Sequence, residues 1–220
     1  MLTEIGLSLA GKNPVEVASF LEIPEQTAFQ DITEPSSFRA LRRRIRSMAR
    51  GKDQEIYLDV IITHDLLANV FELSKRVHCN WLVLEWQKRK RDLLTLANPI
   101  GWLKSHLHCH LGVFRDYGIR YIRKVLTITR DDQNDQLVLT TADRIAKTFN
   151  GKTENISLSP NDVLDIDSIV EQSENFDLII MGSVDFKLKH ILKASDDEKI
   201  MQRALCSVFA IHKSTTLDDF

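Results

Sequence analysis

Short apolar runs alternate with segments of helical period along this chain, and the alternation constrains the fold more than any other feature. The runs with the length and composition of buried strands include 56–63, 81–86 and 177–182. Between them, segments such as 36–50 carry apolar residues at helical spacing. Strands separated by helices predict βαβ units, so we expect an α/β fold with open, mostly parallel sheets and flanking helices.

The same patterns place the individual elements. The predicted strands span 15–23, 56–63, 81–86, 110–115, 123–129, 152–158, 177–182 and 207–212. The predicted helices span 36–50, 66–78, 99–108, 136–149, 163–174 and 198–205. Pro99 suits the first turn of its helix because it lacks an N–H group, and Asn150-Gly151 is a common helix stop.

Composition and charge exclude several classes of protein. The 220 residues are 43% apolar and 27% charged, which excludes an intrinsically disordered, collagen-like or rod-like chain. The formal net charge of −2 argues against a nucleic-acid partner, whose binder would be strongly basic. No apolar run approaches the roughly 18–20 residues of a transmembrane helix, and three scattered cysteines indicate a reducing compartment.

The second half of the sequence repeats the first. Residues 79–84 align with 176–181 at an offset of 97, and the same offset carries Cys109 onto Cys206. We therefore predict two modules, residues 1–118 and residues 119–220.

Nearer the N-terminus the offset is 140, and it carries Ile5 onto Ile145. The second module is therefore shorter by about one helix–strand–helix stretch. The first module has only residues 1–10 before Gly11, so it lacks an opening strand and half a helix, and neighbouring strands should be left unpaired. Either the first module is naturally reduced, or the chain is a fragment whose natural N-terminus lies upstream; we favour the second explanation.

Each half resembles a universal stress protein domain, which implies a five-stranded parallel sheet with Rossmann-like layering. In the second half, four segments resemble elements of the family in order. KVLTIT resembles its opening strand, ADRIAKTFNGK its first helix, FDLIIMGS its fourth strand and ALCSVFAIHK its closing strand. In the first half, the resemblance begins at the family's second strand. The segments that carry it are, in order, EVASFLEIPEQ, HD, CNWLVLEW and HCHLGVFRD.

Tandem modules of this kind also resemble the cytosolic C-terminal regions of cation–chloride cotransporters and certain amino-acid permeases. This resemblance implies a non-catalytic regulatory and dimerisation domain of a transporter of the amino acid–polyamine–cation superfamily. Such a domain would be cytoplasmic, tethered to the inner face of the cell membrane, and would contact the membrane-embedded part of its own transporter and a second copy. The alternatives are a free-standing universal stress protein that binds an adenine nucleotide and, third, a small-molecule-modifying enzyme.

The chain departs from the nucleotide-binding members of this family. They carry an aspartate after the first strand and a glycine-rich stretch after the fourth, because only glycine lets backbone N–H groups approach phosphates closely. Here Arg130 holds the aspartate position, and no further glycine follows Gly182-Ser183. Arg130, Gly182 and Ser183 are the remaining candidates for nucleotide contact, and we expect no resident cofactor unless an adenine nucleotide binds there.

Two basic segments are candidate contacts for an anionic ligand or partner. Residues 39–52 contain seven cations and no acid. On a helix, Arg42, Arg43 and Arg46 lie opposite an apolar stripe made by Phe38, Leu41, Ile45 and Met48. This is either a surface helix that packs on the sheet or a contact for an anionic membrane or acidic protein.

The second segment is Lys88, Arg89, Lys90 and Arg91, after the predicted strand 81–86. Open α/β sheets bind ligands at the carboxyl ends of their strands, so these cations could hold an anion, although a solvated loop has the same composition.

No metal site or catalytic centre is expected. His106, His108, Cys109 and His110 span a predicted helix–strand junction, which would make their side chains diverge. Cys109 and Cys206 are better explained as small buried residues, and Asp65 as a helix cap. Because no catalytic motif occurs, we expect no enzymatic activity.

Overall fold

The computed structural model describes residues 1–27, 36–50, 54–86, 99–159, 164–183 and 196–214. The chain divides into two compact units, Ala10–Cys79 and a larger unit of Met1–Leu9 with Asn80–Phe220. One unit holds a two-stranded sheet and the other a six-stranded sheet, each with flanking helices. The predicted α/β fold with open, mostly parallel sheets is confirmed.

The smaller unit is a strand–helix–strand–helix segment. Its elements are β1 (Val15–Glu22), α2 (Ser36–Arg50), β2 (Ile56–Thr63) and α3 (Leu66–Val77). β1 and β2 pair in parallel along their whole length, while α2 packs on β2 and α3 packs on β1. The Asp65 carboxylate accepts a hydrogen bond from the Ala68 N–H at 3.0 Å, which confirms the predicted cap of α3.

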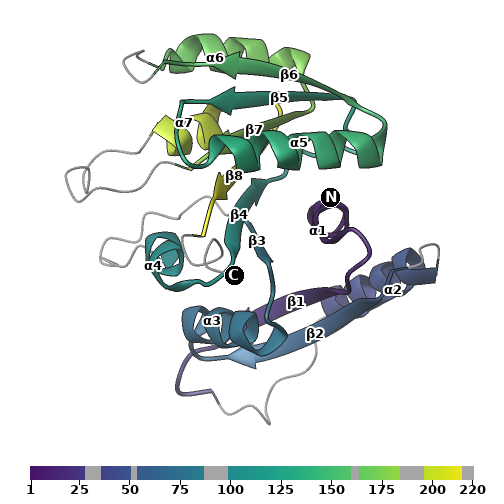
Figure 1. Ribbon diagram of the computed structural model, residues 1–220. Helices are drawn as coiled ribbons and strands as arrows, with labels where there is room; N and C mark the ends of the chain where they lie inside the picture. The colour runs from purple at the N-terminus through teal and green to yellow at the C-terminus, as the bar shows by residue number, and fades with distance from the viewer. Residues whose placement is uncertain (28–35, 51–53, 87–98, 160–163, 184–195, 215–220) are drawn as a thin grey trace. The chain divides into compact units, whose positions relative to one another are not determined.

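The larger unit is built on the six-stranded sheet. Its helices are α1 (Leu2–Ala10), α4 (Pro99–His106), α5 (Asp135–Phe149), α6 (Ile166–Gln172) and α7 (Asp196–Arg203), with a 3₁₀ turn over Ser173–Asn175. Its strands are β3 (Trp81–Glu85), β4 (His110–Arg115), β5 (Lys124–Thr129), β6 (Lys152–Ser157), β7 (Leu178–Gly182) and β8 (Ser207–His212). The strand order is β3-β4-β8-β7-β5-β6, and among the described strands only β4 and β8 pair antiparallel (Figure 1).

The repeat predicted at an offset of 97 residues appears as a local two-fold relation. β3 and β7, α4 and α7, and β4 and β8 each have bounds that differ by this offset. Val113 pairs with Ala210, its own equivalent, in the antiparallel contact between β4 and β8. The pseudo-two-fold axis therefore passes through this residue pair, and the last strands of the two halves join one sheet.

The core of the larger unit draws on both halves. Ile5 and Leu9 of α1 belong to one buried cluster with residues of β5, α5, β7 and β8. Phe114 of β4 meets Phe209 of β8 edge to face, with ring centroids 6.3 Å apart. The Arg144 side chain of α5 also donates a hydrogen bond to the Leu9 carbonyl at 2.8 Å. α1 is thus held beside the helix that the sequence repeat makes its equivalent.

The predicted modules and the compact units divide the chain differently. The boundary between residues 118 and 119 lies inside the larger unit, because β4 and β8 share a sheet. The division into modules 1–118 and 119–220 describes sequence equivalence and stays a prediction.

The first half has no described counterpart of β5. β5 lies between β7 and β6, whereas β3 and β1, the equivalents of those two strands, belong to separate sheets. Within the described ranges, β3 pairs only with β4, and β1 pairs only with β2. The lack of an opening strand in the first module stays a prediction.

Candidate functional site

The carboxyl ends of β5 and β7 form the candidate site. In an open α/β sheet, ligands bind outside the carboxyl ends of strands whose connections leave in opposite directions. The chain leaves β5 through α5 to reach β6 on one side, while β7 lies on the other side. Arg130 follows β5, and Gly182 ends β7 with Ser183 next.

The loop between β5 and α5 binds a carboxylate of its own chain. Both oxygens of Asp135 accept hydrogen bonds from the Arg130 N–H, at 3.1 and 3.2 Å. The Asp132 N–H also donates to Asp135, at 3.3 Å, and Asp131 adopts a left-handed conformation with φ of 56°. A phosphate would have to displace this carboxylate and would be repelled by its charge, although such N–H groups are otherwise good anion donors.

The Arg130 side chain is used in an internal ion pair. Its Nη2 atom lies 3.5 Å from Oδ1 of Asp197, in the first turn of α7. The two side chains are 23% and 8% exposed, so water screens this pair poorly. Arg130 therefore links the end of β5 to α7.

Gly182 and Ser183 are also engaged within the protein. A Cβ atom at Gly182 would lie 3.0 Å from Cβ of Asn134, so the glycine permits close packing of the two loops. The Asn134 side-chain oxygen accepts a hydrogen bond from the Lys213 N–H at 2.9 Å. The Ser183 N–H donates to the Ile211 carbonyl at 2.6 Å, and the Ser183 hydroxyl accepts from the Lys104 ammonium.

The three predicted nucleotide contacts thus lie on neighbouring strand ends but have different internal partners. Arg130 pairs with α7, Gly182 packs on the β5–α5 loop, and Ser183 bonds to β8 and α4. The arrangement fastens helices to the sheet. Their role in nucleotide contact stays a prediction.

A hollow that the sequence reasoning did not predict lies at the ends of β5 and β6. Its volume is about 250 Å³, and its lining residues are Asp131, Asp135, Ser157, Leu158 and Ser159. This is below the roughly 300–1,000 Å³ of typical ligand pockets, and the lining is acidic. The signal in the sequence was that Asp131 and Asp135 follow β5, while Ser157 ends its neighbour β6 and Ser159 comes two residues later.

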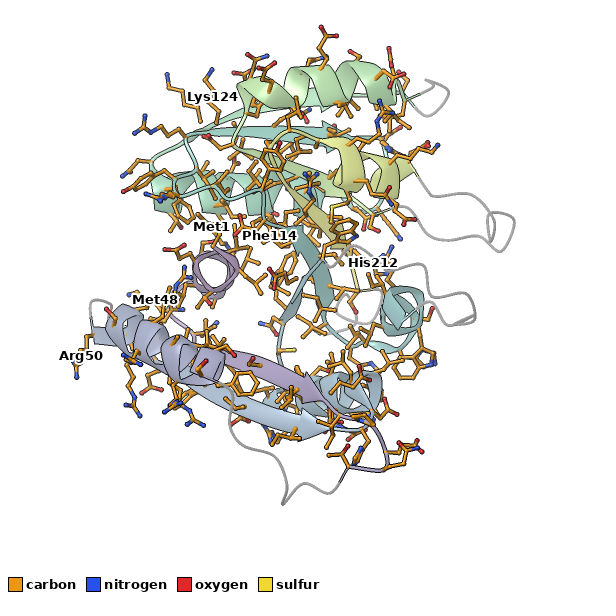
Figure 2. All side chains as sticks on the ribbon, turned by 180° about the vertical axis from the view of Figure 1, so that it is seen from behind. Met1, Met48, Arg50, Phe114, Lys124 and His212 are labelled. Atoms are coloured by element: carbon orange, nitrogen blue, oxygen red, sulfur yellow. The ribbon has the colours of Figure 1, made fainter. Side chains whose placement is uncertain are left out.

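Helix α2 has the two faces predicted for it. Phe38 and Ile45 are buried, while Leu41 and Met48 are half-buried. Arg42, Arg43 and Arg46 are exposed. Figure 2 shows Arg50 projecting outward at the carboxyl end of the same helix. The amphipathic helix is confirmed, and its contact with an anion or partner stays a prediction. Lys88, Arg89, Lys90 and Arg91 lie outside the described residues.

The two repeat-related cysteines are buried, as predicted. Cys109 and Cys206 are 4% and 2% exposed. Burial raises the pKa of the Cys206 thiol to about 12, although the nearby Arg115 guanidinium opposes the rise. A neutral thiol is a poor nucleophile, so Cys206 has a packing role.

The histidines near Cys109 have separate partners. His106 stacks on Trp102 of the same helix with ring centroids 4.2 Å apart, and His110 Nδ1 accepts a hydrogen bond from the Ser214 N–H at 3.1 Å. Across the described residues, no three His, Cys, Asp or Glu side chains are grouped to hold a metal ion.

Comparison with known proteins gives likeness in fold without close sequence similarity. No protein-family model and no curated protein matches the sequence. A functionally unknown protein from Pseudomonas aeruginosa PAO1 has a TM-score of 0.61 at 10% identity, with 96% of each chain covered.

Two further solved structures connect this fold with named proteins. A universal stress protein from Archaeoglobus fulgidus has a TM-score of 0.60 at 12% identity, covering 97% of this chain and 92% of its own. The cytoplasmic domain of a prokaryotic cation chloride cotransporter has a TM-score of 0.58 at 11% identity, with the same coverage. In the described part of the chain, no helix combines the length and apolar character needed to cross a bilayer. The chain therefore has a tandem universal-stress-protein-like fold across nearly its whole length.

Proposed function

We propose that this chain is a non-catalytic regulatory and dimerisation domain of a membrane transporter of the amino acid–polyamine–cation superfamily. The observation that carries the proposal is the Asp135 carboxylate, which occupies the backbone donors of the β5–α5 loop, at the carboxyl end of β5 where a ligand of this fold would bind. The likeness to a cotransporter cytoplasmic domain extends over 92% of that chain. A fold that keeps the layout and fills a strand-end loop with its own side chain suits an assembly role.

The contacts at the strand ends favour a rigid body over a catalyst. Lys104 of α4 bonds to Ser183, and Arg130 pairs with Asp197 of α7. These contacts tie α4 and α7, which are equivalent by the repeat, to the end of β7 and the end of β5. A domain stiffened in this way can transmit a displacement to an attached membrane region, which in this proposal lies on the cytoplasmic side.

The exposed arginines of α2 would provide the contact with the inner leaflet or an acidic protein surface. Arg42, Arg43 and Arg46 lie on the face opposite the buried Phe38 and Ile45. A basic residue near an anionic leaflet contributes about 1 kcal/mol to association. Three such residues suffice for a contact that assists a tether but would not anchor the domain alone.

The test is to identify the native polypeptide. Antibodies raised against the purified chain are used to probe membrane and supernatant fractions of the source cells. The proposal expects a membrane-fraction band much larger than the 25.3 kDa of this chain. A native polypeptide of about this mass found only in the supernatant would contradict it. Light scattering of the purified chain tests the homodimer, and a concentration-independent monomer would contradict that part.

A free-standing nucleotide-binding protein is the alternative, and the hollow beside β5 and β6 is the observation that favours it. Its carboxylates and serine hydroxyls could bond to the hydroxyls of a nucleoside. Thermal unfolding with millimolar ATP, ADP and AMP tests this function. A ligand at 100 times its Kd adds ~2.7 kcal/mol to the free energy of unfolding, which raises the Tm by several degrees. An unchanged Tm excludes binding of these nucleotides with a Kd of about one hundredth of the concentration used.

A further inference from the structure

β6 forms one edge of the six-stranded sheet and is exposed along most of its length. Among the described strands it pairs only with β5, and five of its six residues are exposed (Figure 1). An edge strand presents unpaired N–H and C=O groups, which can pair with a strand of another chain. The sequence of β6, KTENIS, is polar and charged, which disfavours pairing with an apolar strand. A strand that pairs here therefore has to bring polar side chains and matching charges.

The amino ends of β5 and β6 carry three cations, Arg123, Lys124 and Lys152, which we call the basic end. Lys124 and Lys152 lie opposite each other in the parallel pair of β5 and β6, and all three residues are exposed. Figure 2 shows Lys124 projecting outward. The Asp177 carboxylate at this end accepts hydrogen bonds from the Arg123 and Lys124 N–H groups, at 2.7 and 2.9 Å. Among the described residues, none of the three cations is in an ion pair.

The carboxyl ends of the same two strands carry the opposite charge. Asp131 and Asp132 follow β5 and are exposed, and we call this pair the acidic end. Asp131 also lines the hollow of about 250 Å³, together with Leu158 and Ser159, which follow β6. In the part of the chain that the structure describes, neither carboxylate is in an ion pair. The pair β5–β6 thus presents cations at one end and carboxylates at the other, both beside the open edge of β6.

The backbone groups on the open edge of β6 can be assigned from its contact with β5. The Lys152 N–H donates to the Arg123 carbonyl at 2.8 Å, and the Leu158 N–H donates to the Thr129 carbonyl at 2.9 Å. Backbone groups of alternate residues in a strand point to the same side. The N–H and C=O groups of residues 153, 155 and 157 therefore point to the edge away from β5.

We propose that β6 pairs in antiparallel with β6 of a second copy, so that the basic end of each copy lies against the acidic end of the other. This inference rests on the dimerisation in the proposed function and deepens it by naming the interface. An antiparallel pair of identical strands has a two-fold axis, so both charge contacts form at once and the assembly closes at a dimer. A parallel pair would place basic end beside basic end, and like charges across an interface are unfavourable.

The outward backbone groups also predict the register of the pair. In an antiparallel pair, residues whose groups point to the partner strand lie opposite each other, so the two-fold axis passes through one residue and its own copy. An axis at Glu154 would place two glutamates directly opposite, which is destabilising. An axis at Asn155 avoids this and places Lys152 opposite Leu158 of the second copy. Because Leu158 and Asp131 line the same hollow, the Lys152 ammonium then lies beside the acidic end.

The experiment exchanges the charges of the two ends. One variant carries Lys124→Glu and Lys152→Glu, and the other carries Asp131→Lys and Asp132→Lys. Each change places like charges together in both contacts, so each variant alone should dimerise with a dissociation constant raised at least about tenfold. In an equimolar mixture every contact joins opposite charges again, so a dimer of the two variants should form with about the affinity of the parent. Light scattering across a concentration series measures all three, and circular dichroism checks that each variant is folded.

A parent dimer that neither folded variant weakens, or folded variants that fail to pair in the mixture, would overturn this interface and leave the proposed dimerisation standing. A parent that stays monomeric at every concentration would contradict the dimerisation itself and the interface with it.

Hydrogen exchange of the unmodified chain decides the matter if a variant does not fold. The amides of Thr153, Asn155 and Ser157 should exchange at least about tenfold more slowly above the dimerisation midpoint than below it. Unchanged exchange at these three amides, or protection of the β3 edge in their place, would overturn the proposal.

Discussion

β3 and β7 are equivalent by the sequence repeat, yet they differ in burial. All five residues of β7 are buried, whereas four of β3 are half-buried and Glu85 is exposed. The sequences WLVLE and LIIMG are similarly apolar, so composition does not explain the difference. β7 pairs with β5 as its second neighbour, whereas β3 has no second neighbour among the described strands. The burial of a strand thus depends on its neighbours. Two runs of similar apolar composition can both be predicted as buried strands although one of them lies at the edge of the sheet.

A second difference between the halves lies beside the pseudo-two-fold axis. Gly112 of β4 is the equivalent of Phe209 of β8, and a Cβ atom at Gly112 would overlap the Phe209 ring. A symmetric pair would place either two phenylalanines or two glycines here. Because the halves are joined in one chain, one supplies the ring and the other supplies the space for it.

The largest expected effect is a loss of stability from changing this pair. Phe209→Ala should cost about 3–5 kcal/mol, because the ring is fully buried against Phe114. Gly112→Ala should cost about 1–3 kcal/mol by overpacking. Urea unfolding of both single variants and the double variant measures these costs. In the double variant the overlap is gone, so its cost should be below the sum, and additive costs would contradict the packing described here.

The comparison of β7 with β3 is tested by truncating equivalent side chains. Ile179→Ala removes a fully buried side chain and should cost about 3 kcal/mol, within the range known for such sites. Leu82→Ala removes a half-buried one and should cost less than about half as much. Urea unfolding measures both. Equal costs in the two variants would show that β3 is as enclosed as β7.

In the smaller unit, the contact proposed for α2 is tested by charge reversal. Replacing Arg42, Arg43 and Arg46 by Glu should remove about 3 kcal/mol or more of attraction to anionic vesicles. Vesicle co-sedimentation measures the association. The control replaces Arg120, Lys147 and Lys152 by Glu, since these exposed cations of the larger unit give the same change in net charge. A similar loss of association in both variants would contradict a specific contact through α2, because net charge alone would then explain the association.

The smallest expected effect concerns the buried thiol of Cys206, the residue directly before β8. The folded-state pKa of Cys206 is about 12, against about 9 for an ordinary thiol. Between these values the unfolded chain loses the proton and the folded chain keeps it, so folding stability falls as pH rises. The fall from about pH 8 to pH 10.5 in urea unfolding should be smaller in Cys206→Ala than in the parent. A Cys79→Ala control gives the effect of an incompletely buried thiol; an unchanged fall in Cys206→Ala would contradict the account.

Much of the fold could be predicted from the sequence because its signals are local. The apolar run at 177–182 predicts β7, and the Asp65 position predicts the cap of α3. The repeat offset of 97 residues predicts that Cys109 and Cys206 have equivalent buried positions, and both are buried. The antiparallel contact between β4 and β8 could not be predicted, because the pairing of strands about 97 residues apart depends on the packing of the two halves.

Less of the candidate site could be predicted. Arg130 and Gly182 were recognised as departures from a nucleotide-binding pattern, but their internal partners depend on side-chain placement. The Asp135 carboxylate was missed because an aspartate in a first helical turn is ordinary in sequence, and only the structure shows it turned back onto the Arg130 N–H. The hollow beside Ser157 likewise depends on which strands become neighbours.

Hydrogen exchange of the unmodified chain tests the central claim most directly. If β3 is an open edge and β7 is central, the amides of Trp81, Val83 and Glu85 should exchange at least about 100-fold faster than the amides of Leu82 and Leu84. All backbone amides of β7 from Ile179 to Met181 should be as well protected as the slowest of these. Equal, strong protection of every amide in β3 would contradict the account, because it would show that the edge is already covered.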